Sequence, residues 1–180
     1  MKFTTITAVA VALTTVNALS INRRAASTCG EDLDAMDNQL DVLDKLSKSW
    51  TPSLGGYLGA LQGQQEAYKM QTIVNRAIKS CKYSSPASKE EVEHATRQLD
   101  DMVPRIESYL DHIAARKGEF DSVPLVSPLV KNNLKSMHAK TNELRKVVLS
   151  STPASHYDKM DGYFNQIDSA YGRVYDVYGR

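Results

Sequence analysis

The residues that could carry out chemistry in this chain are few and scattered. Glu91 and His94 form the one Glu-x-x-His spacing in the sequence. A di-iron site in a helical bundle needs two such pairs on different helices and two further glutamates, all facing inward. Because no second pair exists and His94 falls at the edge of an apolar face, a surface histidine is the better interpretation. No metal site is predicted.

The remaining polar motifs do not indicate catalysis either. His112, His138 and His156 have no carboxylate or histidine partner at ligand spacing. The sequence contains no Gly-x-Ser-x-Gly motif and no phosphate-binding loop. Gly55, Gly56 and Gly59 loosely resemble a glycine-rich loop, but no strand pattern precedes them. We therefore predict a non-enzymatic protein without a cofactor.

The N-terminus has the pattern of a secretion signal. Lys2 precedes an apolar run over 6–13, and Val16-Asn17-Ala18 places short residues where a signal peptidase cuts. The run is too short to span a bilayer, which needs about 20 apolar residues. The pattern predicts a signal peptide over residues 1–18 and a secreted, extracellular protein, with the cell wall as one destination. A buried N-terminal helix is the alternative.

A second cut is an open question. Arg23 and Arg24 form a dibasic pair just beyond the predicted signal peptide. Either a processing protease removes residues 19–24 as a short leader, or the pair is an exposed pair of arginines. The folded domain is expected to span residues 25–180 in both cases.

Charge excludes two classes of partner. The chain has 22 Lys and Arg against 21 Asp and Glu, and residues 1–24 hold three of the bases and none of the acids. Without this segment the chain carries 19 bases and 21 acids, in no long block of one sign. A nucleic-acid partner would need a clustered basic surface, and so would electrostatic attachment to anionic lipid. Any contact with lipid should therefore be apolar, and no transmembrane segment is expected.

The two cysteines, Cys29 and Cys81, suit the oxidising compartment that a signal peptide implies. An even pair in a secreted chain most often forms a bridge, although sequence alone cannot place the two sulfurs together. Such a disulfide would close a loop of about 50 residues and stabilise the fold by about 4 kcal/mol.

Apolar residues recur at steps of three and four almost throughout the chain, and strand patterns are absent. We predict an all-α protein, a single antiparallel bundle of four to five long amphipathic helices. Ser88 and Glu91 have the spacing of a capping box, Gly118 to Val126 reads as a connection, and Ser127-Pro128 reads as an N-cap followed by proline. The predicted helices cover roughly residues 31–50 and 54–81, a third stretch from Ser88 to the connection at 118–126, a fourth from Ser127 to the break at 150–155, and residues 156–178.

Two features weaken the helices locally. Glycines 55, 56, 59 and 63 crowd the start of the second helix, each unfavourable by about 1 kcal/mol relative to alanine. Pro104 removes one backbone hydrogen bond from the middle of the third helix. These are the places where the helices are expected to separate and leave internal space.

Several stretches, taken in order, resemble a known family. They are Leu54–Gln64, Leu99–Leu110, Ile113–Phe120, Val123–Val130 and Ile167–Tyr171. Their small, apolar and kinked positions are similar to those of the fungal hydrophobic surface-binding protein A family, which includes cell-wall galactomannoprotein antigens. The resemblance implies a secreted helical protein that adsorbs to hydrophobic surfaces and, in some members, holds a fatty acid between its helices. The cysteine pair departs from the family pattern.

The expected partners are therefore a fatty acid or other apolar ligand and hydrophobic surfaces, with a secreted hydrolase or a host protein as further candidates. Tyr171, Tyr175 and Tyr178 share one side of the last helix, as the edge of the core, the rim of a cavity or an adsorptive face. The residues predicted to line a ligand cavity are Leu58, Leu61, Val74, Leu99, Val103, Ile106, Leu110, Leu134, Met137, Ile167 and Tyr171.

Two other functions fit the same helices. A structural cell-wall mannoprotein would have a tightly filled core and heavy O-mannosylation. A secreted effector or antigen that engages a host protein would instead have a specific exposed apolar patch. An internal cavity would favour ligand binding over both.

Overall fold

Every regular element among the described residues is an α-helix. The computed structural model describes residues 12–53, 56–82 and 87–179, with side chains from Cys29 onward. The all-α prediction is confirmed. The helices are α1 (Ala12–Ser49), α2 (Gly56–Ser80), α3 (Lys89–Ala115), α4 (Lys117–Asp121), α5 (Val126–Ser151) and α6 (Ala154–Tyr178).

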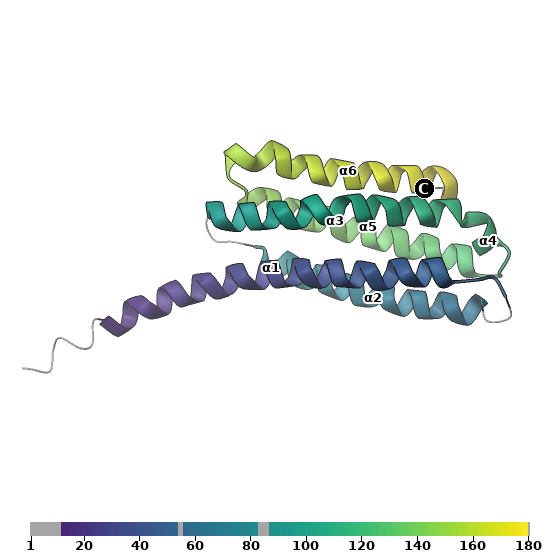
Figure 1. Ribbon diagram of the computed structural model, residues 1–180, viewed down its shortest axis with the longest axis horizontal. Helices are drawn as coiled ribbons and strands as arrows, with labels where there is room; N and C mark the ends of the chain where they lie inside the picture. Colours follow the sequence, from purple (N-terminus) through teal and green to yellow (C-terminus); the bar gives the residue numbers. More distant parts are fainter. Residues whose placement is uncertain (1–11, 54–55, 83–86, 180) are drawn as a thin grey trace, which may run out of the picture.

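The five long helices form a closed ring. α1 packs against α2 and α3, α2 against α5, α5 against α6, and α6 against α3. Successive long helices along the chain run in opposite directions (Figure 1). No helix occupies the centre of this ring, so only side chains fill the space along its axis. The ring therefore provides the place where a cavity can form.

The first helix begins earlier than predicted. The periodicity indicated a start at Glu31, but α1 starts at Ala12 and its first part projects beyond the other helices (Figure 1). The extension has a local cause, since the first glycine is Gly30 and the first proline is Pro52, so nothing upstream breaks a helix. The predicted signal peptide lies partly outside the described residues, and its cleavage stays a prediction.

The start of α3 agrees with the sequence. Ser88 donates its backbone N–H to the Glu91 carboxylate at 2.6 Å, and the Glu91 N–H donates to the Ser88 hydroxyl at 3.3 Å. This reciprocal pair is the predicted capping box. Glu91 is thereby used in a structural role, and His94 is exposed. α3 continues unbroken through the exposed Pro104.

The region between α3 and α5 differs from the prediction. The expected connection contains the one-turn helix α4, anchored by buried Phe120 and supported by an ion pair between Lys117 and Asp121. α5 begins at Val126 rather than after Ser127, and its N-cap is Leu125 in the left-handed conformation, with φ of 70°. The Ser127 hydroxyl donates to Asp121 instead of capping the helix.

The predicted disulfide is present. Cys29 of α1 is bonded to Cys81 directly after α2, and both residues are buried. Beside it the buried Asp32 accepts hydrogen bonds from Arg76 at 3.0 Å and from Ser80 at 2.8 Å. This end of the α1–α2 pair is therefore held covalently and by a satisfied carboxylate. None of the described helices has a stretch apolar and long enough to span a membrane.

Candidate functional site

Two apolar cavities lie inside the helix ring. The larger has a volume of about 160 Å³, and each of the six helices contributes residues to its wall. On α1 the wall residues begin at Met36, after the projecting first part of this helix. The smaller, of about 80 Å³, lies toward the disulfide and includes both cysteines in its wall. A water molecule needs roughly 10–15 Å³ measured in this way, so the larger cavity is far more than a packing defect. Both cavities share the wall residues Met36, Met102, Ile106, Thr141 and Ile167.

Together the cavities are long and narrow. Along α1 their walls run from Cys29 to Trp50, and a helix rises about 1.5 Å per residue, so the two cavities extend over about 30 Å. Four methionines, 36, 70, 102 and 137, lie in the walls of the larger cavity. Methionine is unbranched and flexible, so these walls can adjust to the shape of an apolar occupant.

Most of the residues predicted to line a cavity do so. Leu99 lines the smaller cavity, while Ile106 and Ile167 line both. Val103 is buried in the core without reaching either cavity, and Leu61 is half-buried outside both. The other predicted residues in the wall of the larger cavity are Val74, Leu110, Leu134, Met137 and Tyr171.

Leu58 is a correction. Its side chain is 70% exposed, because the inward face of α2 at this level consists of small residues rather than leucines. The inward positions follow the three- and four-residue steps of a helix face, which are visible in the sequence. The prediction assigned the inward positions to the leucines on another face of α2 instead. The inward positions are Gly59, Gly63, Ala67, Met70 and Val74.

The two glycines on this face have different roles. A Cβ atom on Gly59 would lie 2.9 Å from Cδ1 of Trp50, so glycine is needed for the indole to pack against α2. The indole N–H of Trp50 also donates to the Gly56 carbonyl at 2.7 Å. A Cβ on Gly63 would have no atom within 4 Å, although Gly63 lines the larger cavity. The missing side chain at Gly63 therefore contributes to the empty space.

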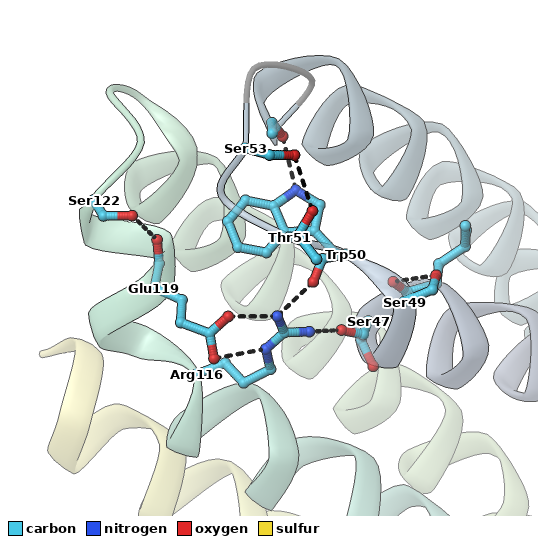
Figure 2. A network of polar contacts seen from close by, with 10 residues as sticks. Ser47, Ser49, Trp50, Thr51, Ser53, Arg116, Glu119 and Ser122 are labelled. Atoms are coloured by element: carbon cyan, nitrogen blue, oxygen red, sulfur yellow. Dashed lines mark hydrogen bonds and ion pairs between the residues drawn. The ribbon is translucent and has the colours of Figure 1, made fainter.

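One end of the larger cavity is closed by aromatic rings and a cation. The rings of Trp50 and Phe120 lie 4.8 Å apart between centroids, and the Arg116 guanidinium lies 5.5 Å from the Trp50 ring. Figure 2 shows this guanidinium donating to the carbonyls of Ser47 and Trp50 and to the Glu119 carboxylate. Arg116 thus satisfies the free carbonyls at the end of α1. The hydrogen bond from Arg116 to the Glu119 carboxylate lowers the pKa of Glu119.

Polar groups in the wall of the larger cavity are few, and they are neutral. Burial raises the pKa of Tyr109 to about 12, with the Asp44 carboxylate adding to the shift, and burial also raises the pKa of Tyr171. Both phenols are therefore protonated at physiological pH. The other polar wall residues of the larger cavity are Ser47, Gln64, Asn133 and Thr141.

The tyrosines of α6 belong to the edge of the core. Tyr171 and Tyr178 are buried, and the Tyr178 hydroxyl donates to the Ile113 carbonyl at 3.1 Å. The Tyr175 hydroxyl lies 3.2 Å from Nδ1 of His138, whose ring stacks on Tyr171. Of the interpretations that the sequence left open for these tyrosines, the edge of the core fits these contacts, although Tyr171 also reaches the cavity.

The cavity comes closest to solvent along the seam between α2 and α5. Most of its half-buried wall residues lie on these two helices, whereas those on α6 are buried. These half-buried residues are Gly59, Gly63, Gln64 and Ala67 on α2, and Leu129, Val130, Asn133, Met137 and Thr141 on α5.

Three solved structures share this fold. AfMP4p, crystallised in complex with palmitic acid, is 25% identical, with a TM-score of 0.79 over 86% of this chain and 99% of that one. Ligand-binding domain 2 of the Penicillium marneffei MP1 protein, complexed with multiple arachidonic acids, is 11% identical with a TM-score of 0.66, over 89% and 96% of the two chains. Domain 1 of the same protein, also complexed with arachidonic acids, is 14% identical with a TM-score of 0.66, over 89% and 97%.

No curated protein matches the sequence. The profile of the family described as hydrophobic surface binding protein A matches residues 26–150, which is most of the chain. The resemblance indicated by the sequence motifs is thereby confirmed, and the chain belongs to the hydrophobic surface binding protein A family.

Proposed function

We propose that this protein is a secreted, non-enzymatic carrier that binds a fatty acid or a similar single-chain lipid inside its helix ring. The observation that carries the proposal is the pair of adjoining apolar cavities, about 30 Å long, with walls from all five long helices. The palmitic acid bound by AfMP4p, which covers 86% of this chain in the comparison, supports the same ligand class.

The energetics favour a long acyl chain. Burying one CH₂ group contributes about 0.8 kcal/mol, so a sixteen-carbon chain gains on the order of 10 kcal/mol before ordering costs. The ligand must widen the cavities as it enters, and methionines such as Met102 and Met137 are suited to that adjustment.

Secretion is part of the proposal. The disulfide between Cys29 and Cys81 supports an oxidising compartment, and the predicted signal peptide agrees with it. The extracellular space is the proposed location, with the cell wall as a finer possibility. A purely structural mannoprotein would have little use for the cavities, which is why ligand binding is preferred.

Filling the cavity tests this function. Replacing Gly63 with leucine is expected to abolish lipid binding, at least a tenfold loss of affinity, because the new side chain occupies the empty space beside α2. Stability should hold or rise, since glycine within a helix is about 1 kcal/mol less favourable than alanine or leucine. Native mass spectrometry of the secreted protein would report a bound lipid directly.

Gly162→Leu is the matched control. Gly162 also lies within a long helix and has no atom within 4 Å of an added Cβ, but it lines neither cavity. This variant should bind lipid as the unmodified protein does. Equal binding by the Gly63 and Gly162 variants, or a secreted protein that takes up no fatty acid at all, would contradict the proposed function.

A second function, adsorption to a hydrophobic surface, is favoured by two exposed leucines. Leu58, in the first turn of α2, is 70% exposed, and Leu125, the N-cap of α5, is 67% exposed. Leu125 also has a φ of 70°, which is uncommon for a leucine. Both lie at the end of the bundle where Trp50 closes the larger cavity, and neither side chain contributes to the core.

We expect the double variant Leu58→Gln, Leu125→Asn to be depleted much less from solution by alkyl-coated beads. Because both side chains are exposed and asparagine tolerates a positive φ, the fold should be unchanged. Val42, which is 39% exposed and lies about two turns before the end of α1, provides the control Val42→Gln. Adsorption that persists in the double variant, or that is lost equally in the control, would exclude this end as the adsorbing surface.

A further inference from the structure

The described residues of the cavity walls carry no positive charge. Among those that line the larger cavity there is no lysine, arginine or histidine. The one acidic or basic side chain in the wall of the smaller cavity is Glu91, whose carboxylate accepts the N–H of Ser88 in the capping box. The polar atoms that an occupant would meet are therefore hydroxyl and amide groups.

The cation that packs on the aromatic end of the wall is already paired. The Arg116 guanidinium lies 5.5 and 5.8 Å from the centroids of the Trp50 and Phe120 rings. Figure 2 shows its donors directed at Glu119 and at the carbonyls of Ser47 and Trp50. A carboxylate inside the cavity would have to displace these contacts in order to reach it.

Several charged groups on the helices around the cavity are also paired with each other, and one carboxylate, Asp44, lies close to a tyrosine of the wall. Asp44 of α1 raises the pKa of Tyr109, so the tyrosine that contributes a wall hydroxyl experiences a negative rather than a positive group. The pairs beside the wall are Asp44 with Lys48 on α1, Glu66 with Lys69 on α2, Arg105 of α3 with Asp37 and Asp41, Lys140 with Glu143 on α5, and His138 of α5 with Asp168 of α6.

An ionised head group is poorly matched to such a site. A carboxylate removed from water without a cationic partner is strongly disfavoured, whereas an uncharged hydroxyl or carbonyl needs only a neutral hydrogen-bond partner. Tyr109, Asn133 and Thr141 offer such partners in the wall. We propose that the cavity selects single-chain lipids with an uncharged head group, which are long-chain alcohols, esters and protonated acids, over the carboxylate anion. This inference rests on the proposed lipid-binding function and specifies its ligand class.

A preference for the neutral head group means that the affinity for a fatty acid falls as the pH rises. If the neutral acid is the bound form, affinity for a fatty acid is constant below the pKa of its carboxyl group and falls up to about tenfold per pH unit above it. An alcohol of the same length does not titrate, so its affinity should stay constant. Any effect of His138, whose ring stacks on the wall residue Tyr171, on the cavity would appear with the alcohol as well.

The experiment compares dodecanoic acid with 1-dodecanol between pH 5 and pH 8, below the concentration at which either aggregates. The disulfide-bonded protein is used, and Trp50, the one tryptophan in the chain, reports binding because it lines the larger cavity. The alcohol should bind at least tenfold more tightly at pH 8, and the two affinities should converge toward pH 5. Tighter binding of the acid at pH 8, or an affinity for the acid that does not change with pH, would overturn the proposal. Failure of both ligands to bind would instead contradict the lipid-binding function itself.

Two lysine variants test the missing cation directly. Gln64 lines the cavity at the α2–α5 seam, whereas its neighbour Gln65 is exposed. Gln64→Lys should increase the affinity for dodecanoic acid at pH 8 about tenfold and leave 1-dodecanol unchanged, while Gln65→Lys, with the same net charge, should change neither. An unchanged affinity of the Gln64 variant for the acid would contradict the proposed charge selection.

Discussion

Replacing Trp50 with alanine is expected to lower the free energy of unfolding by about 3–5 kcal/mol, the range for a large buried aromatic residue. The indole is 8% exposed and packs between Phe120 and the backbone of Gly59. Its removal also deprives the Gly56 carbonyl of its hydrogen-bond donor. Since the ring forms one end of the larger cavity, the same change should make this end permeable to water.

Urea denaturation followed by the helical circular dichroism signal measures this effect, because the variant has no tryptophan. Trp50→Phe separates the two contributions. It retains an aromatic ring against Phe120 but loses the indole N–H, so a smaller loss, about 1–2 kcal/mol, is expected. Tyr57→Ala, at an exposed position nearby, should change stability by less than about 0.5 kcal/mol. A similarly small effect of Trp50→Ala would show that the ring does not close the bundle.

Local sequence patterns predicted much of the fold. The three- and four-residue apolar steps placed the long helices, and the capping box placed the start of α3 within a residue. These features depend on interactions within about one helical turn, so sequence alone contains them. The order of helices around the ring does not, because amphipathic stripes of similar composition can pair in several ways.

The wall of the cavity was predicted less completely, for a specific physical reason. Leucines were assumed to face inward, which holds for Leu110 and Leu134 but not for Leu58. On α2 the space is made by glycine and alanine, and the large residues beside them are left outside. A cavity is defined by missing side chains, and hydrophobic periodicity detects only those that are present.

Arg116 could not have been identified from its sequence position. It follows the end of α3 and contacts carbonyls of Ser47 and Trp50, more than sixty residues away along the chain. Only the ring arrangement brings these groups together. The same holds for Asp44, which adds to the effect of burial in raising the pKa of Tyr109 in another helix.

The two adjoining cavities are closed by different means at their two ends. At the Trp50 end the closure depends on packing and on the hydrogen bonds of Arg116, which can break and re-form. At the other end Cys29 and Cys81 join α1 to the end of α2 covalently and form part of the wall of the smaller cavity. Ligand uptake should therefore involve the α2–α5 seam or the Trp50 end, while the disulfide end stays fixed.

Removing the disulfide tests this asymmetry. The bridged residues are separated by 52 positions, and closing a loop of that length stabilises the fold by about 4 kcal/mol. The double variant Cys29→Ala, Cys81→Ala should lose about that amount, which corresponds to a fall in Tm of roughly 8–16 °C for a domain of this size. Calorimetry measures the fall, and the reduced unmodified protein is the control, since it loses the same constraint without a change of sequence.

Ligand length then distinguishes a local from a global effect of this loss. A sixteen-carbon acyl chain extends further toward the smaller cavity than a ten-carbon chain does, and the walls of the larger cavity do not include the cysteines. If the disulfide holds only its own end closed, the double variant should bind hexadecanol several-fold more weakly and bind decanol normally at a temperature where it remains folded. Equal weakening for both ligands would mean that the bond supports the whole ring, because release of one end would then have loosened α1 and α2 along their full length.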